Sequence, residues 1–79
     1  MYINKMVYAE RYDFNDEDFD FLMNNGIIAE TDYNTTEIMK DTVIYNKEDE
    51  KIIETLEKTL GKEVTEALLN EEIDLVMIV

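Results

Sequence analysis

The chain has 79 residues, of which 20 are Asp or Glu and seven are Lys or Arg, and its formal net charge at pH 7 is −13. It has no His, Cys or Ser, which removes the commonest general base and nucleophiles of enzymes, and it has no basic patch for direct nucleic-acid binding. Because 46% of the residues are hydrophobic and regularly patterned, we expect one folded domain over residues 1–79 rather than a disordered acidic chain.

Residues 2–10 alternate in the way that is typical of a strand. Val7 and Ala9 share one face of this strand. Met6 and Tyr8 share the other face. Because apolar groups lie on both faces, the pattern predicts an interior strand.

Residues 15–25 are predicted to form a short helix that begins and ends on local signals. Asn15 is a suitable N-cap, because its side-chain oxygen can accept a hydrogen bond from the first turn. Phe14 and Phe19 stand at the two positions of a hydrophobic staple around this cap. Gly26 is placed as the left-handed residue that follows a helix.

Two further strands are predicted over residues 27–33 and 36–45, joined by a turn at Asn34 and Thr35. A second helix is predicted to begin after Asn46 as its N-cap. The apolar stripe of that helix continues beyond a glycine at position 61, so one bent helix and two separate helices fit the sequence equally well.

The chain ends in an almost unbroken apolar run, residues 73–79, which predicts a last strand. The order strand, helix, strand, strand, helix, strand is that of the α+β ferredoxin-like split βαβ fold. We therefore expect a four-stranded antiparallel sheet with its helices on one face and the last strand at an edge. No apolar run is long enough to span a membrane and residues 1–10 lack the pattern of a signal peptide, so a cytoplasmic protein is expected.

The negative charge is clustered in sequence. Residues 10–32 carry eight acids and one Arg, a net charge of −7, and residues 63–79 carry five acids and no base. Acids in the first turn of the helix over residues 15–25 are also explained by the positive end of the helix dipole. Glu54 and Lys58 have the spacing of an ordinary i,i+4 ion pair.

The other acids have no such local explanation. Glu71, Glu72 and Asp74 are expected at the C-terminal end of a helix, where the dipole is negative and no Lys or Arg lies nearby in sequence. Glu30 and Asp32 would lie about 6.6 Å apart on one strand face, which is two residues of strand rise. This spacing is close to two phosphate steps of one DNA strand, at about 3.4 Å each.

These patterns predict an acidic surface that imitates phosphates, with tyrosines beside the acids as interface anchors. The residues expected to bind a partner are Asp16, Glu17, Asp18, Asp20, Glu30, Asp32, Glu71, Glu72, Asp74, Tyr12 and Tyr33.

No metal site, cofactor or catalytic residue is predicted. Calcium-binding loops started at Asp13 or Asp16 lack the Gly at position 6 and the Glu at position 12 of an EF-hand. The only glycines, Gly26 and Gly61, cannot form a Gly-rich phosphate-binding loop. We therefore expect a protein that is not an enzyme.

In size, charge and lack of cysteine, the whole chain resembles the small acidic inhibitors that phages and mobile elements direct against host defence, the anti-CRISPR and anti-restriction proteins. No motif carries this resemblance, and it transfers no functional residue. It implies a non-catalytic cytoplasmic inhibitor that binds the basic nucleic-acid-binding surface of a nuclease as a nucleic-acid mimic. The alternative is a small self-associating regulatory or assembly domain, such as a homodimer, that uses its sheet edge or sheet face.

Overall fold

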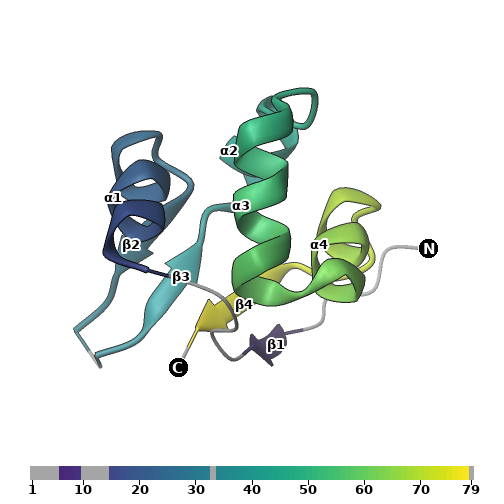
Figure 1. The fold of residues 1–79 in the computed structure, drawn as a ribbon. Helices are drawn as coiled ribbons and strands as arrows, with labels where there is room; N and C mark the ends of the chain where they lie inside the picture. Colours follow the sequence, from purple (N-terminus) through teal and green to yellow (C-terminus); the bar gives the residue numbers. More distant parts are fainter. Residues whose placement is uncertain (1–5, 10–14, 33, 79) are drawn as a thin grey trace.

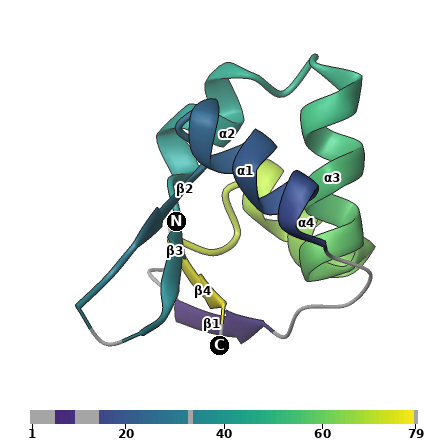
Figure 2. The ribbon, with the colours of Figure 1, turned by 60° about the vertical axis from the view of Figure 1, so that its left-hand side comes forward.

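The computed structural model describes residues 6–9, 15–32 and 34–78 (Figure 1). This part of the chain forms an α+β fold with a four-stranded sheet and four helices. In chain order the elements are β1 (Met6–Ala9), α1 (Asp16–Asn24), β2 (Ile28–Glu30), β3 (Thr36–Ile38), α2 (Lys40–Tyr45), α3 (Glu50–Leu60), α4 (Lys62–Leu69) and β4 (Leu75–Ile78). The helices gather on one face of the sheet (Figures 1 and 2).

The sheet is mixed, with the strand order β1-β4-β3-β2. β3 pairs antiparallel with β2 and with β4, whereas β1 pairs parallel with β4. The prediction of a purely antiparallel sheet is therefore wrong, and the split βαβ strand order is not confirmed. A parallel pair needs a long crossover, and here the chain from β1 to β4 supplies it through all the helices.

Two predictions about sheet edges are also wrong. β4 lies between β1 and β3, so the last strand is interior, which agrees with its apolar residues on both faces. β1 is an edge strand whose outer side chains, Met6 and Tyr8, are 49% and 63% exposed. Ala9 on its inner face is buried. Apolar residues on both faces of β1 therefore mark an exposed apolar face rather than an interior strand.

The strand predicted over residues 36–45 is wrong after Ile38. β3 ends there, and Lys40–Tyr45 forms α2, which buries Val43 in the core. The β-branched residues of this segment favour a strand locally, but burial against neighbouring elements overrides this preference. Asn46 therefore ends a helix rather than starting one, and its side-chain Nδ2 donates to the Thr42 carbonyl oxygen at 2.8 Å.

Helix α3 begins at a different residue from the predicted one. Its N-cap is Asp49, whose Oδ1 accepts from the backbone N–H groups of Lys51 at 3.1 Å and Ile52 at 3.3 Å. It ends at Gly61, where φ is 85° and ψ is 158°. Because no helix continues through this backbone conformation, α3 and α4 are two separate helices.

The local signals around α1 are confirmed where the structure describes them. Asn15 Oδ1 accepts from the Asp18 backbone N–H at 2.9 Å, as expected of an N-cap. Gly26 has φ of 71°, as expected of the residue after the helix. Asn34 has φ of 59° in the β2–β3 turn. Phe14, the predicted staple partner, lies outside the described residues.

The core joins the inner face of the sheet to the helices. Its fully buried members include Leu22 of α1, Val43 of α2, Leu56 of α3, Leu68 of α4 and Val76 of β4. One apolar cluster therefore holds each helix against the sheet, and none of the described helices covers the opposite face of the sheet (Figure 2).

Candidate functional site

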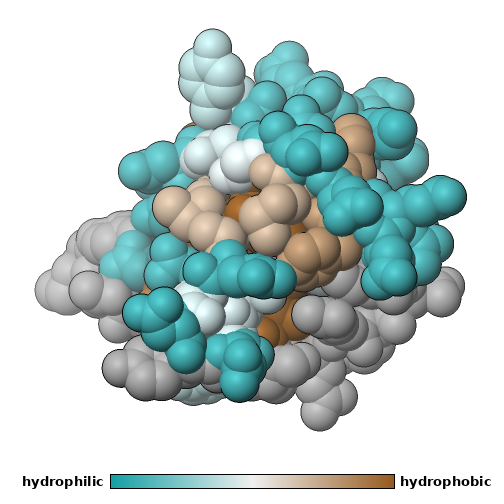
Figure 3. All heavy atoms as spheres, turned by 90° about the vertical axis from the view of Figure 1, so that its left-hand side faces the viewer, coloured by the Kyte–Doolittle hydropathy of each residue, from teal (hydrophilic) through white to brown (hydrophobic). Residues whose placement is uncertain are grey.

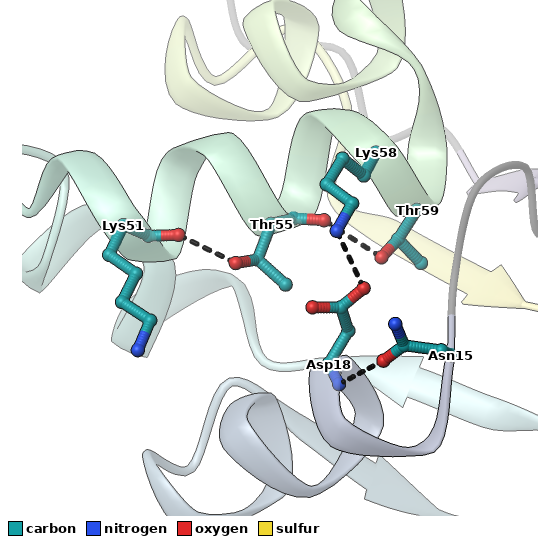
Figure 4. A network of polar contacts seen from close by, with 6 residues as sticks. All are labelled: Asn15, Asp18, Lys51, Thr55, Lys58 and Thr59. Atoms are coloured by element: carbon teal, nitrogen blue, oxygen red, sulfur yellow. Dashed lines mark hydrogen bonds and ion pairs between the residues drawn. The ribbon is translucent and has the colours of Figure 1, made fainter.

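The acids of α1 lie on an exposed helix that one ion pair ties to α3. Asp16, Glu17 and Asp20 are exposed. Asp18 Oδ2 instead lies 2.8 Å from Lys58 Nζ of α3 (Figure 4). The hydrogen bond from Lys58 lowers the pKa of the Asp18 carboxyl, and a hydrogen bond from the Asn15 backbone contributes a smaller decrease. Asp18 therefore serves in docking α1, and the other acids of α1 face solvent.

Two lysines of α3 point towards α1. Besides the Lys58 ion pair, Lys51 Nζ lies over the Phe21 ring of α1, 4.5 Å from its centroid. A cation over an aromatic face is attracted to it. Lys58 thus contacts a residue 40 positions away, and its predicted i,i+4 pair with Glu54 stays a prediction. The side chains of Lys51 and Lys58 therefore both lie at the contact between α3 and α1, which we call the seam between these helices.

The buried side of α3 carries threonines whose hydroxyls are satisfied within the helix (Figure 4). Thr55 Oγ1 donates to the Lys51 carbonyl oxygen at 2.7 Å, and Thr59 Oγ1 donates to the Thr55 carbonyl oxygen at 2.8 Å. Among the described residues, no buried side-chain N or O atom lacks a hydrogen-bond partner.

The solvent side of α3 carries an acidic stripe that the sequence analysis missed. Glu50, Glu54 and Glu57 are spaced i, i+4, i+7, which places them on one helix face. They border a shallow hollow of about 370 Å³ that Lys47, Glu48 and Ile53 also line. The i, i+4, i+7 spacing of these glutamates could have predicted the stripe from the sequence. The net charge of the middle of the chain does not reveal it, because acids and lysines in that segment nearly cancel. We call these three glutamates the α3 stripe.

The acids after α4 are held by a distant lysine. Lys40 Nζ of α2 lies 3.0 Å from Asp74 Oδ1 and 3.9 Å from Glu71 Oε1. Glu72 is exposed, and Glu71 has a left-handed φ of 59°. No Lys or Arg lies near these acids in sequence, and the fold supplies one from α2, 34 residues away from Asp74.

The hairpin acids do not share a strand face. β2 ends at Glu30, and Asp32 lies in the turn that follows, so the strand spacing assumed for the pair does not apply. Both side chains are exposed. Tyr12 and Tyr33, the predicted anchors, lie outside the described residues.

The structure divides the described site residues among three places: α1, the β2–β3 hairpin and the α4–β4 turn. Glu30 pairs with Thr36, which pairs with Ile78 on its other side. Asp74 precedes Ile78 by four residues, which is about 13 Å of extended chain. The hairpin acids and the α4–β4 acids thus lie towards opposite ends of the sheet. The α1 acids instead lie beside α3.

Figure 3 views the molecule from the side on which α1 lies. Hydrophilic side chains there surround a smaller apolar area (Figure 3). Phe19, Phe21 and Met23 of α1 are half-buried and pack against the core. The acids of this side are therefore displayed on a helix anchored by apolar contacts.

Neither a metal centre nor a membrane span emerges from the described residues. Over these ranges, no group of three or more acidic side chains is arranged to hold a metal ion. None of the described helices has the length and apolar character needed to cross a membrane. Comparisons with protein-family models, curated proteins and solved structures gave no match.

Proposed function

We propose that this protein is a non-catalytic, cytoplasmic inhibitor that binds the basic nucleic-acid-binding surface of a nuclease or related defence protein. The observation that carries the proposal is the arrangement of charge across α1 and α3. Lys51 and Lys58 are engaged in the seam between these helices, and the exposed acids of both helices face outward without them.

The acids of α3 form a row whose spacing is of the same order as that of phosphates. Glu50, Glu54 and Glu57 rise along the axis of α3 in steps of about 4.5 to 6 Å. Successive phosphates of one DNA strand rise by about 3.4 Å, so each step along α3 spans between one and two phosphates. The exposed Asp16 and Asp20 add further acids on α1, the helix that packs beside α3. Such a surface attracts a basic groove from a distance and loses affinity as salt increases.

The test is inhibition of DNA cleavage by a panel of purified restriction and RNA-guided nucleases. We expect at least one nuclease to be inhibited, with relief by excess inactive duplex DNA and by higher salt. The triple variant Glu50→Gln, Glu54→Gln, Glu57→Gln should lose the inhibition, because it removes the α3 stripe while keeping side-chain size and helix propensity.

A matched control removes three exposed charges elsewhere. The variant Glu63→Gln, Glu66→Gln, Asp41→Asn changes net charge equally and should inhibit as the unmodified protein does. Equal loss in both variants would assign binding to net charge alone. Inhibition that survives in the α3-stripe variant, or that ignores added duplex DNA, would contradict the proposal.

The sheet-edge form of the self-associating alternative has lost its support. It relied on β4 as a bare apolar edge, and β4 is the strand between β1 and β3. The exposed face of the sheet remains to be explained, and it points to a different occupant.

A further inference from the structure

The face of the sheet that turns away from the helices is continuous and largely apolar. Strand pairing places Tyr8, Met77, Glu37 and Ala29 side by side across all four strands. Met6 and Leu75 form the neighbouring pair of β1 and β4. We call these six residues the outer sheet face.

The outer sheet face is open to solvent where its large side chains lie. Tyr8 is 63% exposed and Met6 is 49% exposed, while Leu75 and Met77 are half-buried. Tyr and Met are enriched at protein interfaces, and Met adapts its shape to a partner. The core packs against the opposite face of the sheet, so these side chains are not part of the core.

A hollow of about 290 Å³ lies where this face meets the first turn of α2. Leu75 and Met39 supply apolar walls, and Glu37 and Asp41 supply negative charge. Lys40 and Asp74 also line the hollow, and they are paired with each other, which leaves Glu37 and Asp41 as the acids that a partner can meet there. A cationic side chain therefore fits this end of the face.

The charges argue against a second copy of the chain as the occupant. The described strands contain no Lys or Arg, and Glu37 is their charged residue on the outer sheet face. Two copies would bring together two chains of net charge −13. Apolar contact combined with like-charge repulsion selects a partner that is both apolar and basic.

We propose that the outer sheet face binds a basic amphipathic helix of another protein. The apolar side chains of that helix would cover Met6, Tyr8 and Met77, and a Lys or Arg would enter the hollow beside Glu37 and Asp41. This surface is separate from the acids of α1 and α3, so the inference does not depend on nuclease inhibition.

Methionine methyl NMR tests this inference, because the methionines report on different places. Met6 and Met77 lie on the outer sheet face and Met39 lines the hollow, whereas Met23 packs on the α1 side. The probe is a short helical peptide of Leu and Lys with its Leu residues on one face. We expect the methyl signals of Met6, Met39 and Met77 to shift on titration and that of Met23 to stay.

Two controls separate docking from simple charge attraction. A peptide with every Leu replaced by Ser keeps the charge, and it should bind at least about tenfold more weakly. Tyr8→Ser should weaken binding of the Leu–Lys peptide by at least about tenfold, because it removes an aromatic anchor. Tyr45→Ser is the matched variant, since Tyr45 is 89% exposed on α2, and it should bind normally.

Each other outcome would overturn the inference. Equal binding of the Ser peptide would show attraction by charge alone. Normal binding by Tyr8→Ser, or shifts confined to Met23, would place the site elsewhere. Shifts of Met6 and Met77 that depend on protein concentration without peptide would identify a second copy as the occupant. Nuclease assays with Tyr8→Ser keep this result distinguishable from the proposed inhibitory function.

Discussion

Helix α1 and the turn between α4 and β4 are both acidic, and each is held by one lysine from a distant helix. Lys58 binds Asp18 of α1, and Lys40 binds Asp74 of the turn. The settings differ, because the side chain of Lys58 is 47% exposed and that of Lys40 only 16%. An ion pair loses strength with solvent exposure, so similar acid clusters depend on their lysines to different extents.

The two clusters also differ in the helix ends that they occupy. The acids of α1 include the first turn of that helix, where the dipole and the Asn15 N-cap already favour them. Glu71 and Asp74 follow the C-terminal end of α4, where the dipole opposes them. We infer that Lys40 offsets a repulsion that α1 does not have, while Lys58 adds to a helix that is stabilised locally.

The largest expected effect is that of Lys40→Ala. It leaves the half-buried Asp74 without its cation, and we expect the free energy of unfolding to fall by about 1–3 kcal/mol. Urea denaturation followed by circular dichroism measures this change. Lys47→Ala, at an exposed lysine nearby in sequence, is the control and should change stability little. Equal losses in the two variants would remove the special role of Lys40.

A smaller loss is expected for Lys58→Ala. The pair with Asp18 is partly exposed, so the free energy of unfolding should fall by less than it does in Lys40→Ala. A double-mutant cycle with Asp18→Asn isolates the coupling between the two side chains. A loss that matches or exceeds that of Lys40→Ala would reverse the comparison between the two clusters.

The smallest effect is a pH dependence that belongs to Asp18. Its folded-state pKa lies below the ordinary value of 3.8, mainly because Lys58 donates a hydrogen bond to it. A depressed pKa contributes stability that is present above pH 3.8 and is lost as pH falls through the folded-state value. Denaturation at a series of acidic pH values should therefore show a steeper loss in the unmodified protein than in Asp18→Asn.

The comparison between the two proteins is needed because acidification also changes the net charge of the whole chain. A less negative charge relieves the self-repulsion of a chain with net charge −13, which by itself would raise stability. Carbon-13 NMR titration of the Asp18 carboxyl gives the folded-state pKa directly. A value at or above 3.8 would contradict the role assigned to Lys58.

Parts of the fold governed by neighbouring residues could be predicted well. The Asn15 cap, the glycine after α1 and the Asn34 turn follow from hydrogen bonds and backbone preferences within a few residues. The segment that became α2 could not be predicted in this way. Its residues prefer strands in isolation, and contacts of Val43 with the core decide for a helix.

The candidate site shows the same division. That the chain is acidic, and which segments carry the acids, is plain from composition. Which acids are free depends on Lys40 and Lys58, whose partners lie 34 and 40 residues away. The α3 stripe was not predicted, because lysines close to it in sequence make the net charge of this segment small. In the structure, Lys51 and Lys58 are turned to α1 instead.

The sequence by itself determined the α+β composition, the excess of negative charge, the ends of α1 and the break available at Gly61, because each depends on residue type or on close neighbours. Only the tertiary structure decided that β1 and β4 pair in parallel, that β4 is interior and that Met6 and Tyr8 face solvent. Strand order and register minimise exposed apolar area over the whole chain. A local pattern predicts which residues can be buried, and the tertiary structure determines which of them are buried.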